Sequence, residues 1–330
     1  MVMTDDGEVQ SFDALLKKEL PKIEYHVENI IPKKGTIYVF GPPGTFKTSF
    51  LLWLTLKGAD GQDVFEFKVE KPFRTLWIDE EMGESGCQDK INKLKNGITF
   101  SNPDCLKENF IVSFKRFNLF NQEHIKWLKE KLSTLKPNVV VFDSLARIFN
   151  LKESEAEMAK FVFNILSPLV VEFNVVFIII AHARKKAFQQ KSINIEDLAG
   201  SREFAASSEG LLAIDCAGGR DEYRLKQVKN RYQKKEYCID FSVNECEDRI
   251  TIGYQGTTTE KIARRKKFEQ CAEAMLEWKA NGGPDEFHWS DADKAMTEKG
   301  FKNNAICDAL ALLLSKKKLV VKNDKYAWDL

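Results

Sequence analysis

The chain has 330 residues, which is enough for about two domains at the usual size of roughly 150 residues each. Hydrophobic residues make up 43% of it and charged residues 30%, which is ordinary for a soluble globular protein. The formal net charge of +1 indicates no charged partner, so any surface that binds nucleic acid must be local.

The cysteines and the first residues bear on the compartment. Seven cysteines are scattered without a C-x-x-C pair, which argues against a zinc site and against a disulfide-stapled secreted fold. The first ten residues are polar and acidic, unlike a signal peptide, and the longest apolar run, Val175–Ala181, is too short to span a bilayer. We therefore expect a soluble, cytoplasmic protein without a membrane partner.

Residues 1–28 read as a polar lead-in, and residues 29–254 alternate short apolar segments with helical ones. This alternation predicts an α/β core with a mostly parallel sheet. The expected strands are apolar on both faces, as strands covered by helices on two sides are: Thr36–Phe40, Thr75–Asp79, Phe110–Phe114, Val139–Asp143, Val175–Ala181 and Gly210–Asp215. The expected helices between them are Thr48–Leu56, Glu84–Leu94, Glu123–Leu135 and Glu155–Glu172.

The pattern changes after Asp215. Three adjacent short strands predict an antiparallel edge: Tyr223–Asn230, Glu236–Val243 and Arg249–Tyr254. Residues 255–330 are expected to form a hinge and a small second domain, with helices at 262–280, 291–299 and 303–315 and strands at 319–322 and 326–329. This order is that of a winged helix. Basic residues at Arg264–Lys267 and Lys316–Lys318 leave two partners open, duplex DNA and another protein.

A glycine- and proline-rich loop follows the first core strand and opens a helix. Its sequence, Gly41-Pro-Pro-Gly-Thr-Phe-Lys-Thr48, is a Walker A motif in the required context. Loop N–H groups and the positive helix end form a cradle for the phosphates of ATP. Lys47 neutralises phosphate charge, and the Thr48 hydroxyl binds Mg²⁺. The predicted nucleotide-binding residues are Gly41, Pro42, Pro43, Gly44, Thr45, Phe46, Lys47, Thr48 and Ser49.

One position departs from the motif, because Phe46 stands where the last glycine is expected. Glycine there permits a close approach of the backbone, so we expect the Phe46 ring to point away from the phosphates. A proline-rich turn with a chance lysine is the alternative. The register of strand, turn and helix favours the nucleotide site.

A second acidic element, Asp143, ends the apolar strand Val139–Asp143. A buried carboxylate is costly unless it is paired or faces a metal ion. Asp143 is therefore expected to hold Mg²⁺ through water, as a Walker B aspartate does. An aspartate that merely ends a strand is the alternative.

The order of these motifs resembles that of RecA-fold ATPases and, among them, the RepA-like hexameric helicases of plasmids and phages. The resemblance covers about residues 25–245 and rests on six segments: Ile30–Gly35, the Walker A loop, Leu76–Met82, Val141–Leu145, Ile180–Arg184 and Lys229–Arg231. It implies a RecA-like core, hydrolysis of ATP with Mg²⁺, and assembly into a homo-hexameric ring.

The resemblance also implies roles for single residues. Glu81 matches the glutamate that activates the attacking water, and Glu80 is its nearest rival. His182 matches a polar residue that senses the γ-phosphate, although a lone histidine at a strand end is more often structural.

Two further sets follow from the resemblance. Lys229 and Arg231 lie two apart on a strand and so point to one face. They match the cations inserted into the neighbouring subunit's nucleotide site, with a solvated edge strand as the alternative. The loop Arg184–Leu198 matches the segment that faces the channel of the ring and contacts single-stranded DNA, or else is a solvated loop. Its candidate DNA-binding residues are Arg184, Lys185, Lys186 and Lys191.

Three functions are compatible with these patterns. The leading hypothesis is an ATP-hydrolysing oligomeric motor acting on DNA, a replicative helicase of a mobile element or virus. An ATP-controlled DNA-binding regulator or replication initiator that uses the winged helix is the second. A recombinase-like or KaiC-like ATPase is the third.

Overall fold

The computed structural model of the chain describes residues 12–17, 23–148, 155–183, 197–198, 201–217, 221–232, 237–258, 260–322 and 325–329. These residues divide into two compact units with a boundary between Gln255 and Gly256, and a short stretch at the start of β10 groups with the second unit. The first unit begins with a short helix, α1 (Phe12–Lys17), whose Phe12 and Leu16 are exposed.

A nine-stranded sheet in the order β11-β10-β9-β8-β3-β7-β6-β4-β5 organises the first unit. Six strands run parallel: β3 (Gly35–Gly41), β4 (Thr75–Asp79), β5 (Phe110–Ser113), β6 (Val139–Asp143), β7 (Val176–His182) and β8 (Gly210–Cys216). β9 (Glu222–Asn230) pairs antiparallel with β8, and β10 (Cys238–Glu245) and β11 (Ile250–Thr258) continue the sheet beyond it. The expected α/β class, with a mostly parallel sheet and an antiparallel edge, is confirmed.

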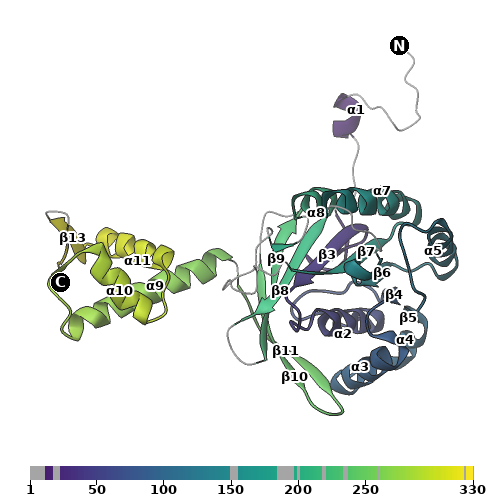
Figure 1. The fold of residues 1–330 in the computed structure, drawn as a ribbon, viewed down its shortest axis with the longest axis horizontal. Coiled ribbons are helices and arrows are strands. Elements are labelled where there is room, and N and C mark those ends of the chain that lie inside the picture. The colour runs from purple at the N-terminus through teal and green to yellow at the C-terminus, as the bar shows by residue number, and fades with distance from the viewer. Residues whose placement is uncertain are drawn as a thin grey trace. The chain divides into compact units, whose positions relative to one another are not determined.

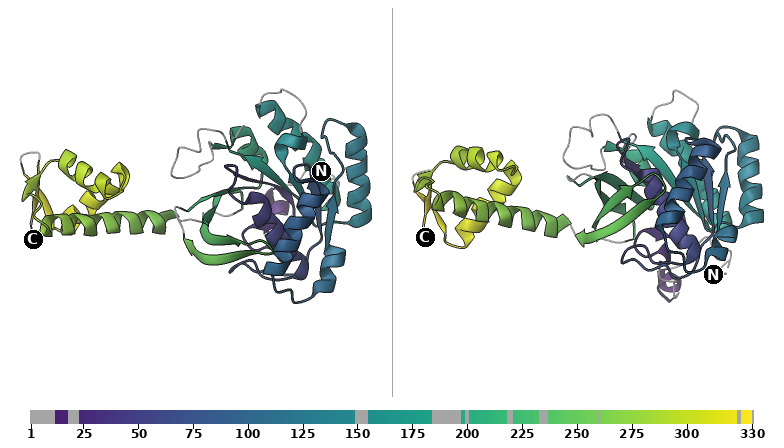
Figure 2. Two further views of the ribbon diagram at one scale, coloured as in Figure 1. Left: turned by 60° about the horizontal axis from the view of Figure 1, so that its bottom comes forward. Right: turned by 90° about the horizontal axis from the view of Figure 1, so that it is seen from below.

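Helices cover both faces of this sheet (Figures 1 and 2). On one side lie α2 (Lys47–Asp60), α3 (Gly83–Gly97) and α4 (Pro103–Asn109), and on the other α5 (Gln122–Leu135), α6 (Leu145–Ile148), α7 (Glu155–Phe173) and α8 (Ser201–Ser207). β4 and β6 are therefore buried along their whole length, which explains their uninterrupted apolar sequences. The carboxyl ends of the parallel strands form one edge, where ligands bind in open α/β sheets.

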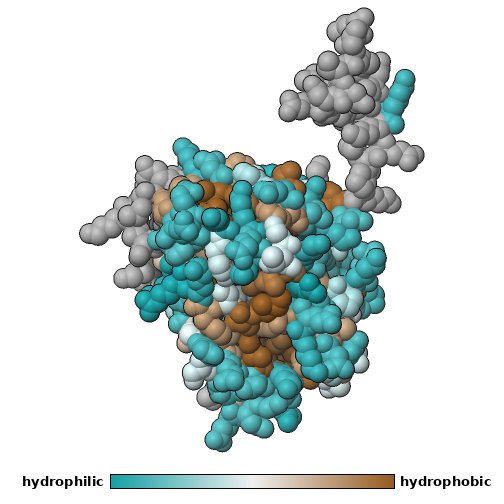
Figure 3. All heavy atoms as spheres, turned by 90° about the vertical axis from the view of Figure 1, so that its right-hand side faces the viewer, coloured by the Kyte–Doolittle hydropathy of each residue, from teal (hydrophilic) through white to brown (hydrophobic). Residues whose placement is uncertain are grey.

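β5 is the outermost strand on one side of the sheet, and its residues are only half-buried. Phe114, which follows the strand, exposes 39% of its surface. The face of the molecule at this side shows apolar side chains gathered between polar ones (Figure 3).

Several short elements were not predicted, namely α4, α6, α8 and a hairpin of β1 (Tyr25–Val27) with β2 (Ile31–Pro32). The start of α4 depends on a contact that is distant in the sequence. The backbone N–H groups of Ser101 and Asn102, which lead into α4, both donate to the Asp60 carboxylate at 2.7 Å. The expected strand bounds were otherwise close. However, β11 reaches Thr258, so it extends past residue 255, where a hinge was expected to begin.

The second unit contains α9 (Glu260–Ala280), β12 (Glu286–Phe287), α10 (Trp289–Glu298), α11 (Asn303–Ser315), β13 (Leu319–Lys322) and β14 (Lys325–Trp328). Its strands form a sheet in the order β12-β14-β13, of which β12 was not predicted. The buried side chains of Met275, Phe287, Ile306 and Leu310 are part of its own core. The three expected helices and two expected strands are present, and their assignment to a winged helix stays a prediction.

Candidate nucleotide-binding site

The loop that joins β3 to α2 lies at the carboxyl edge of the sheet. β3 is buried throughout and pairs with β7 and β8, so the start of this loop is fixed by the centre of the core. α2 begins at Lys47, and its first backbone N–H groups have no partner within the helix. These groups and the helix dipole favour an anion in front of the loop.

The loop is also held by its own side chains. The Lys47 ammonium and the Thr45 hydroxyl both donate to the Pro42 carbonyl, at 2.7 and 2.8 Å. Burial lowers the pKa of Lys47 to about 8, and nearby carboxylates oppose that shift. Lys47 therefore has a carbonyl as its hydrogen-bond partner and no carboxylate in direct contact. A phosphate would supply the negative charge that a buried ammonium lacks here.

Two glycines of the loop are required by its geometry. A Cβ atom on Gly41 would lie 2.1 Å from the backbone oxygen of Ile214, so the close approach of β8 excludes any side chain there. Gly44 has a φ of +76°, a conformation that residues with a side chain seldom adopt. Phe46 occupies the left-handed region as well, with φ 56° and ψ 24°.

A cavity of about 320 Å³ opens in front of the loop, within the size range of small-molecule sites. Its walls come from the loop, from β7 and from segments far along the chain. The lining residues are Pro43, Gly44, Phe46, Lys47, Thr48, Ser49, Glu81, Lys90, Ile180, His182 and Glu245. Lys90 and Glu245 were not predicted from the sequence, because nothing in their local patterns distinguishes them from surface residues.

Asp143 and Thr48 meet beside this cavity. The Thr48 hydroxyl donates to Oδ2 of Asp143 at 2.9 Å, and Oδ1 of the same fully buried carboxylate has no partner among the described residues. Burial raises the pKa of Asp143 to about 7, and the hydrogen bond from Thr48 opposes the shift. A divalent cation at this pair would offset the cost of burying the carboxylate.

These two oxygen ligands fit Mg²⁺. The described residues contain no cluster of three or more His, Cys, Asp or Glu side chains that would hold a metal ion unaided. Mg²⁺ in phosphate sites usually retains water and takes one or two protein ligands besides phosphate oxygens. The pair Thr48 and Asp143 therefore matches a magnesium site that is completed by a phosphate ligand.

The two candidate glutamates after β4 point in different directions. The Glu80 carboxylate accepts a hydrogen bond from the backbone N–H of Phe117, in the loop that follows β5. Glu81 instead lines the cavity, with its Oε1 3.9 Å from Nε2 of His182. Of the two carboxylates, Glu81 is the one placed to act on a molecule inside the cavity.

His182 is the last residue of β7 and lies opposite Gly41 in the parallel register. Its Nδ1 atom is buried and has no hydrogen-bond partner within the described part of the chain. Burial and the neighbouring Lys47 lower its pKa, which favours the neutral form of the ring. A neutral imidazole with a free nitrogen can hydrogen-bond a ligand.

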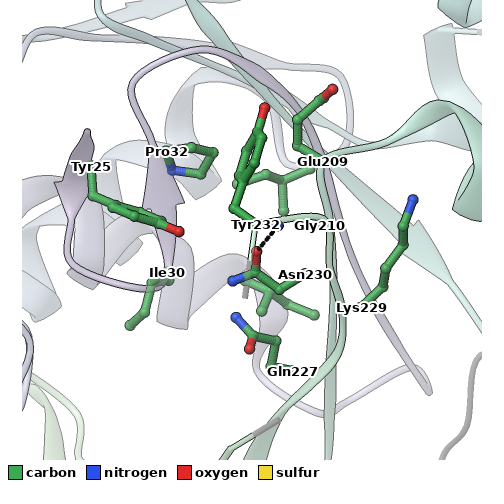
Figure 4. A pocket seen from close by; sticks show the side chains of 11 residues that line it. Tyr25, Ile30, Pro32, Glu209, Gly210, Gln227, Lys229, Asn230 and Tyr232 are labelled. Carbon is green, nitrogen blue, oxygen red and sulfur yellow. Dashed lines mark hydrogen bonds between the residues drawn. The ribbon is translucent and has the colours of Figure 1, made fainter. Parts of the chain in front are cut away.

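The structure does not bring Lys229 and Arg231 to the nucleotide cavity of their own chain. Lys229 pairs with Leu211 near the start of β8. It therefore lies at the amino-terminal ends of the parallel strands, whereas the Walker A loop lies at their carboxyl ends. Its ammonium donates to the carbonyls of Ala205 and Ser208. Figure 4 shows Lys229 beside Glu209 at a small pocket where β1–β2 meets the ends of β8 and β9.

One expectation about this pair was wrong. β9 ends at Asn230, so Arg231 lies just beyond the strand rather than on it. Its guanidinium donates to the Ala206 carbonyl at 2.7 Å and contacts the Glu209 carboxylate at 3.3 Å. Both cations are nevertheless held by the same segment, residues 205–209.

The predicted DNA-binding residues, Arg184, Lys185, Lys186 and Lys191, lie outside the described residues. None of the helices in the described ranges is long and apolar enough to cross a bilayer.

The chain is similar to known proteins in its sequence family and in its fold. A family model described as an AAA domain matches residues 4–187. No curated protein sequence matches the chain. Among solved structures, one described as an ATPase domain has a TM-score of 0.50 at 13% identity, covering 66% of this chain and 84% of that one.

Two other solved structures are similar over comparable lengths. A KaiC-like protein from the hyperthermophilic archaeon Pyrococcus horikoshii OT3 gives a TM-score of 0.47 at 14% identity, with 71% of this chain and 99% of that chain covered. A DnaB-like replicative helicase gives 0.49 at 13% identity, with 66% and 59% covered. The match to the solved ATPase domain supports the expected RecA-like fold, and the two lower scores add nothing to it.

Proposed function

Because this chain belongs to the AAA domain family, we propose that it is an ATPase that hydrolyses Mg-ATP between subunits of an oligomer and works on DNA as a helicase-type motor. The observation that carries this proposal is the cavity in front of the Walker A loop. It places Lys47, Thr48, Glu81 and His182 around one space, with Asp143 hydrogen-bonded to Thr48.

Binding follows from the loop and the start of α2. The N–H groups of the loop and the Lys47 ammonium bind the phosphate oxygens, and Thr48 and Asp143 hold Mg²⁺. The metal ion supplies charge neutralisation on the transferring phosphoryl group when it is bound. Lys47 is released from the Pro42 carbonyl as it contacts phosphate.

Hydrolysis requires a base and a group that responds to the terminal phosphate. Glu81 is the proposed base, because its carboxylate faces the cavity and can accept a proton from a water molecule. His182 is neutral and lies within 3.9 Å of that carboxylate, so it can link the state of the phosphate to the position of Glu81. The roles of both residues are part of the proposal.

The positions of Lys229 and Arg231 favour action between subunits. They lie at the opposite edge of the sheet from the loop of their own chain, so they can reach a nucleotide only in another copy. A cation inserted into a neighbouring nucleotide site in this way can accelerate phosphoryl transfer by ~10³–10⁵-fold. A homo-hexameric ring is the assembly that the motif order implies, and a lone subunit should be a poor ATPase.

Action on DNA is supported by the motif order and by the basic composition of residues 184–191. Lysine and arginine side chains there would bind the phosphates of single-stranded DNA without reading sequence, and the second unit would contact duplex DNA or a protein. ATP hydrolysis would then move these segments along one strand.

The test is ATP turnover with and without single-stranded DNA, together with unwinding of a forked duplex. We expect DNA to stimulate turnover, the fork to be unwound, and Lys47→Ala to abolish both activities. Stable duplex binding without stimulation would instead favour the ATP-controlled regulator. Absence of Mg-ATP binding by the wild type would refute the ATPase itself.

A further inference from the structure

Lys90 occupies an unusual position for a lysine on a surface helix. Cys87 and Leu94, three residues before and four residues after it on α3, are both fully buried, so Lys90 projects from the inward face of the helix. It lines the nucleotide cavity, and its ammonium donates to the Ser49 hydroxyl at 3.2 Å. Within the described ranges of the chain it forms no ion pair, and the neighbouring Asp89 pairs with Lys93.

A half-buried cation without a carboxylate partner, facing a cavity, indicates an anionic ligand. Its place along that ligand follows from Ser49. Lys47, Thr48 and Ser49 are successive residues of the first turn of α2, and Glu81 and His182 lie at the end of the cavity where hydrolysis is proposed. The ammonium of Lys90 therefore lies at the start of α2, one residue beyond the proposed metal ligand Thr48. Since Lys47 and Thr48 are assigned to the terminal phosphates, the phosphate left for Lys90 is the one nearest the nucleoside.

Glu245 lines the same cavity from the last residue of β10. Lys93, one turn after Lys90 on α3, contacts the Glu245 carboxylate at 3.9 Å and so places it beside α3. A carboxylate would repel phosphate, but it is a good acceptor for hydroxyl groups. The vicinal hydroxyls of a ribose are donors that can reach such a carboxylate, and they lie nearer to the α-phosphate than the amino group of adenine does.

We propose that Lys90 and Glu245 form the nucleoside end of the cavity, where Lys90 binds the α-phosphate and Glu245 accepts hydrogen bonds from the ribose hydroxyls. The site thereby selects ribonucleotides. This inference rests on the proposed binding of Mg-ATP at the Walker A loop. It assigns ligand contacts to two residues that lie outside every motif of the sequence.

The test is isothermal titration of the full-length chain with Mg-ADP, Mg-2′-deoxy-ADP and Mg-pyrophosphate. Lys90→Met should weaken ADP binding about ten-fold, the size expected for a charge-assisted hydrogen bond, and should leave pyrophosphate binding unchanged. Lys95→Met is the matched control, since Lys95 lies on the same helix but is exposed. Glu245→Ala, which removes both acceptor oxygens, should reduce the preference of the wild type for ADP over 2′-deoxy-ADP to near unity.

Each alternative result has a distinct meaning. ADP binding by Lys90→Met that equals that of Lys95→Met would overturn the role of Lys90. Equal losses for ADP and pyrophosphate would also overturn it, because the change would then act on the loop itself. The ribose contact would be overturned if the wild type bound ADP and 2′-deoxy-ADP equally well. It would also be overturned if Glu245→Ala kept the preference of the wild type for ADP. If Lys47→Ala bound Mg-ADP as well as the wild type does, the Walker A loop would not be the nucleotide site. That result would refute the proposed function itself, independently of Lys90 and Glu245.

Discussion

The ring of Phe46 stands edge-on against the ring of Tyr223, with centroids 5.1 Å apart and planes inclined by 61°. Phe46 belongs to the Walker A loop, and Tyr223 to the first antiparallel strand, β9. The contacts continue from Tyr223 to Phe241 at 5.8 Å and from there to Phe50 of α2 at 5.0 Å. The aromatic side chain that replaces glycine is therefore anchored in the core between α2 and the antiparallel edge.

This anchoring predicts an order of stability for variants of Phe46. A side chain in the left-handed region costs about 1–2 kcal/mol, which glycine avoids. Phe46→Ala keeps that cost and loses the ring contacts, and we expect it to lower the free energy of unfolding by about 2 kcal/mol. Phe46→Gly loses the contacts but relieves the strain, so it should be about 1 kcal/mol more stable than Phe46→Ala.

Urea unfolding of the three proteins measures these differences. A Phe46→Gly chain that is no more stable than Phe46→Ala would show that the left-handed backbone at this position costs nothing. Tyr223→Leu should destabilise the wild type more than it destabilises Phe46→Ala, because the Phe46 ring contact is already absent from Phe46→Ala whereas the contact of Tyr223 with Phe241 is present in both.

The separate environments of Glu80 and Glu81 predict different defects for two isosteric changes. Glu81→Gln removes the proposed base, and we expect kcat for ATP to fall at least ~10²-fold with nucleotide binding retained. Glu80→Gln keeps an oxygen that accepts from the Phe117 backbone and leaves Glu81 in the cavity, so its kcat should stay within a few-fold of the wild type. Steady-state ATP turnover and ADP titrations measure both effects. The opposite pattern would assign the base to Glu80.

The parts of the site that the sequence predicts are those whose signal is local. The spacing of the residues from Gly41 to Thr48 identifies the loop, which lies between a buried strand and a helix. Asp143 ends a run of apolar residues, and such a run is typical of a strand that is covered on both faces. The same apolar runs predict the parallel strands, because burial on both faces leaves no room for polar residues.

The rest depends on tertiary contacts that no local pattern reveals. Lys90 resembles any lysine on a polar helix until α3 packs beside α2 and carries its ammonium to Ser49. The pairing register of β9 on β8 shifts between Leu211 and Leu212, which alternation in the sequence does not show. The choice of Glu81 over Glu80 likewise depends on the backbone N–H of Phe117, which comes from another strand connection.

Half-buried His26 predicts how the free energy of unfolding depends on pH. The ring lies in β1 against Phe73, with centroids 5.4 Å apart, and burial lowers its pKa from 6.5 to about 4. Below pH 6.5 the unfolded chain binds a proton that the folded chain does not, so the contribution of His26 is present above pH 6.5 and is lost as the pH falls towards 4. At pH 5.0 the loss amounts to about 2 kcal/mol.

A His26→Phe chain isolates this effect because phenylalanine does not titrate. The difference in unfolding free energy between pH 7.5 and pH 5.0 should be about 2 kcal/mol smaller in the variant than in the wild type. Urea unfolding at the two pH values measures it. An equal pH dependence in both proteins would show that His26 is protonated in the folded chain.

The placement of Arg231 far from the loop of its own chain predicts complementation between two inactive variants. Arg231→Ala should bind Mg-ADP normally and hydrolyse ATP poorly, because the missing guanidinium serves the adjacent subunit. Glu81→Gln lacks the base but retains Arg231. In an equimolar mixture about one interface in four joins an intact Glu81 to an intact Arg231, so about a quarter of wild-type turnover should return.

Turnover is measured after the two chains are mixed and allowed to reassemble, with native mass recorded to show that mixed oligomers form. Arg249→Ala provides the matched control, since it removes the same charge from an exposed turn and should leave turnover unchanged. Activity that stays at the sum of the two variants, although mixed oligomers are present, would mean that Arg231 acts within its own chain or not at all. Recovery near one quarter would require the nucleotide to lie between subunits, because neither chain alone contains a complete set of groups.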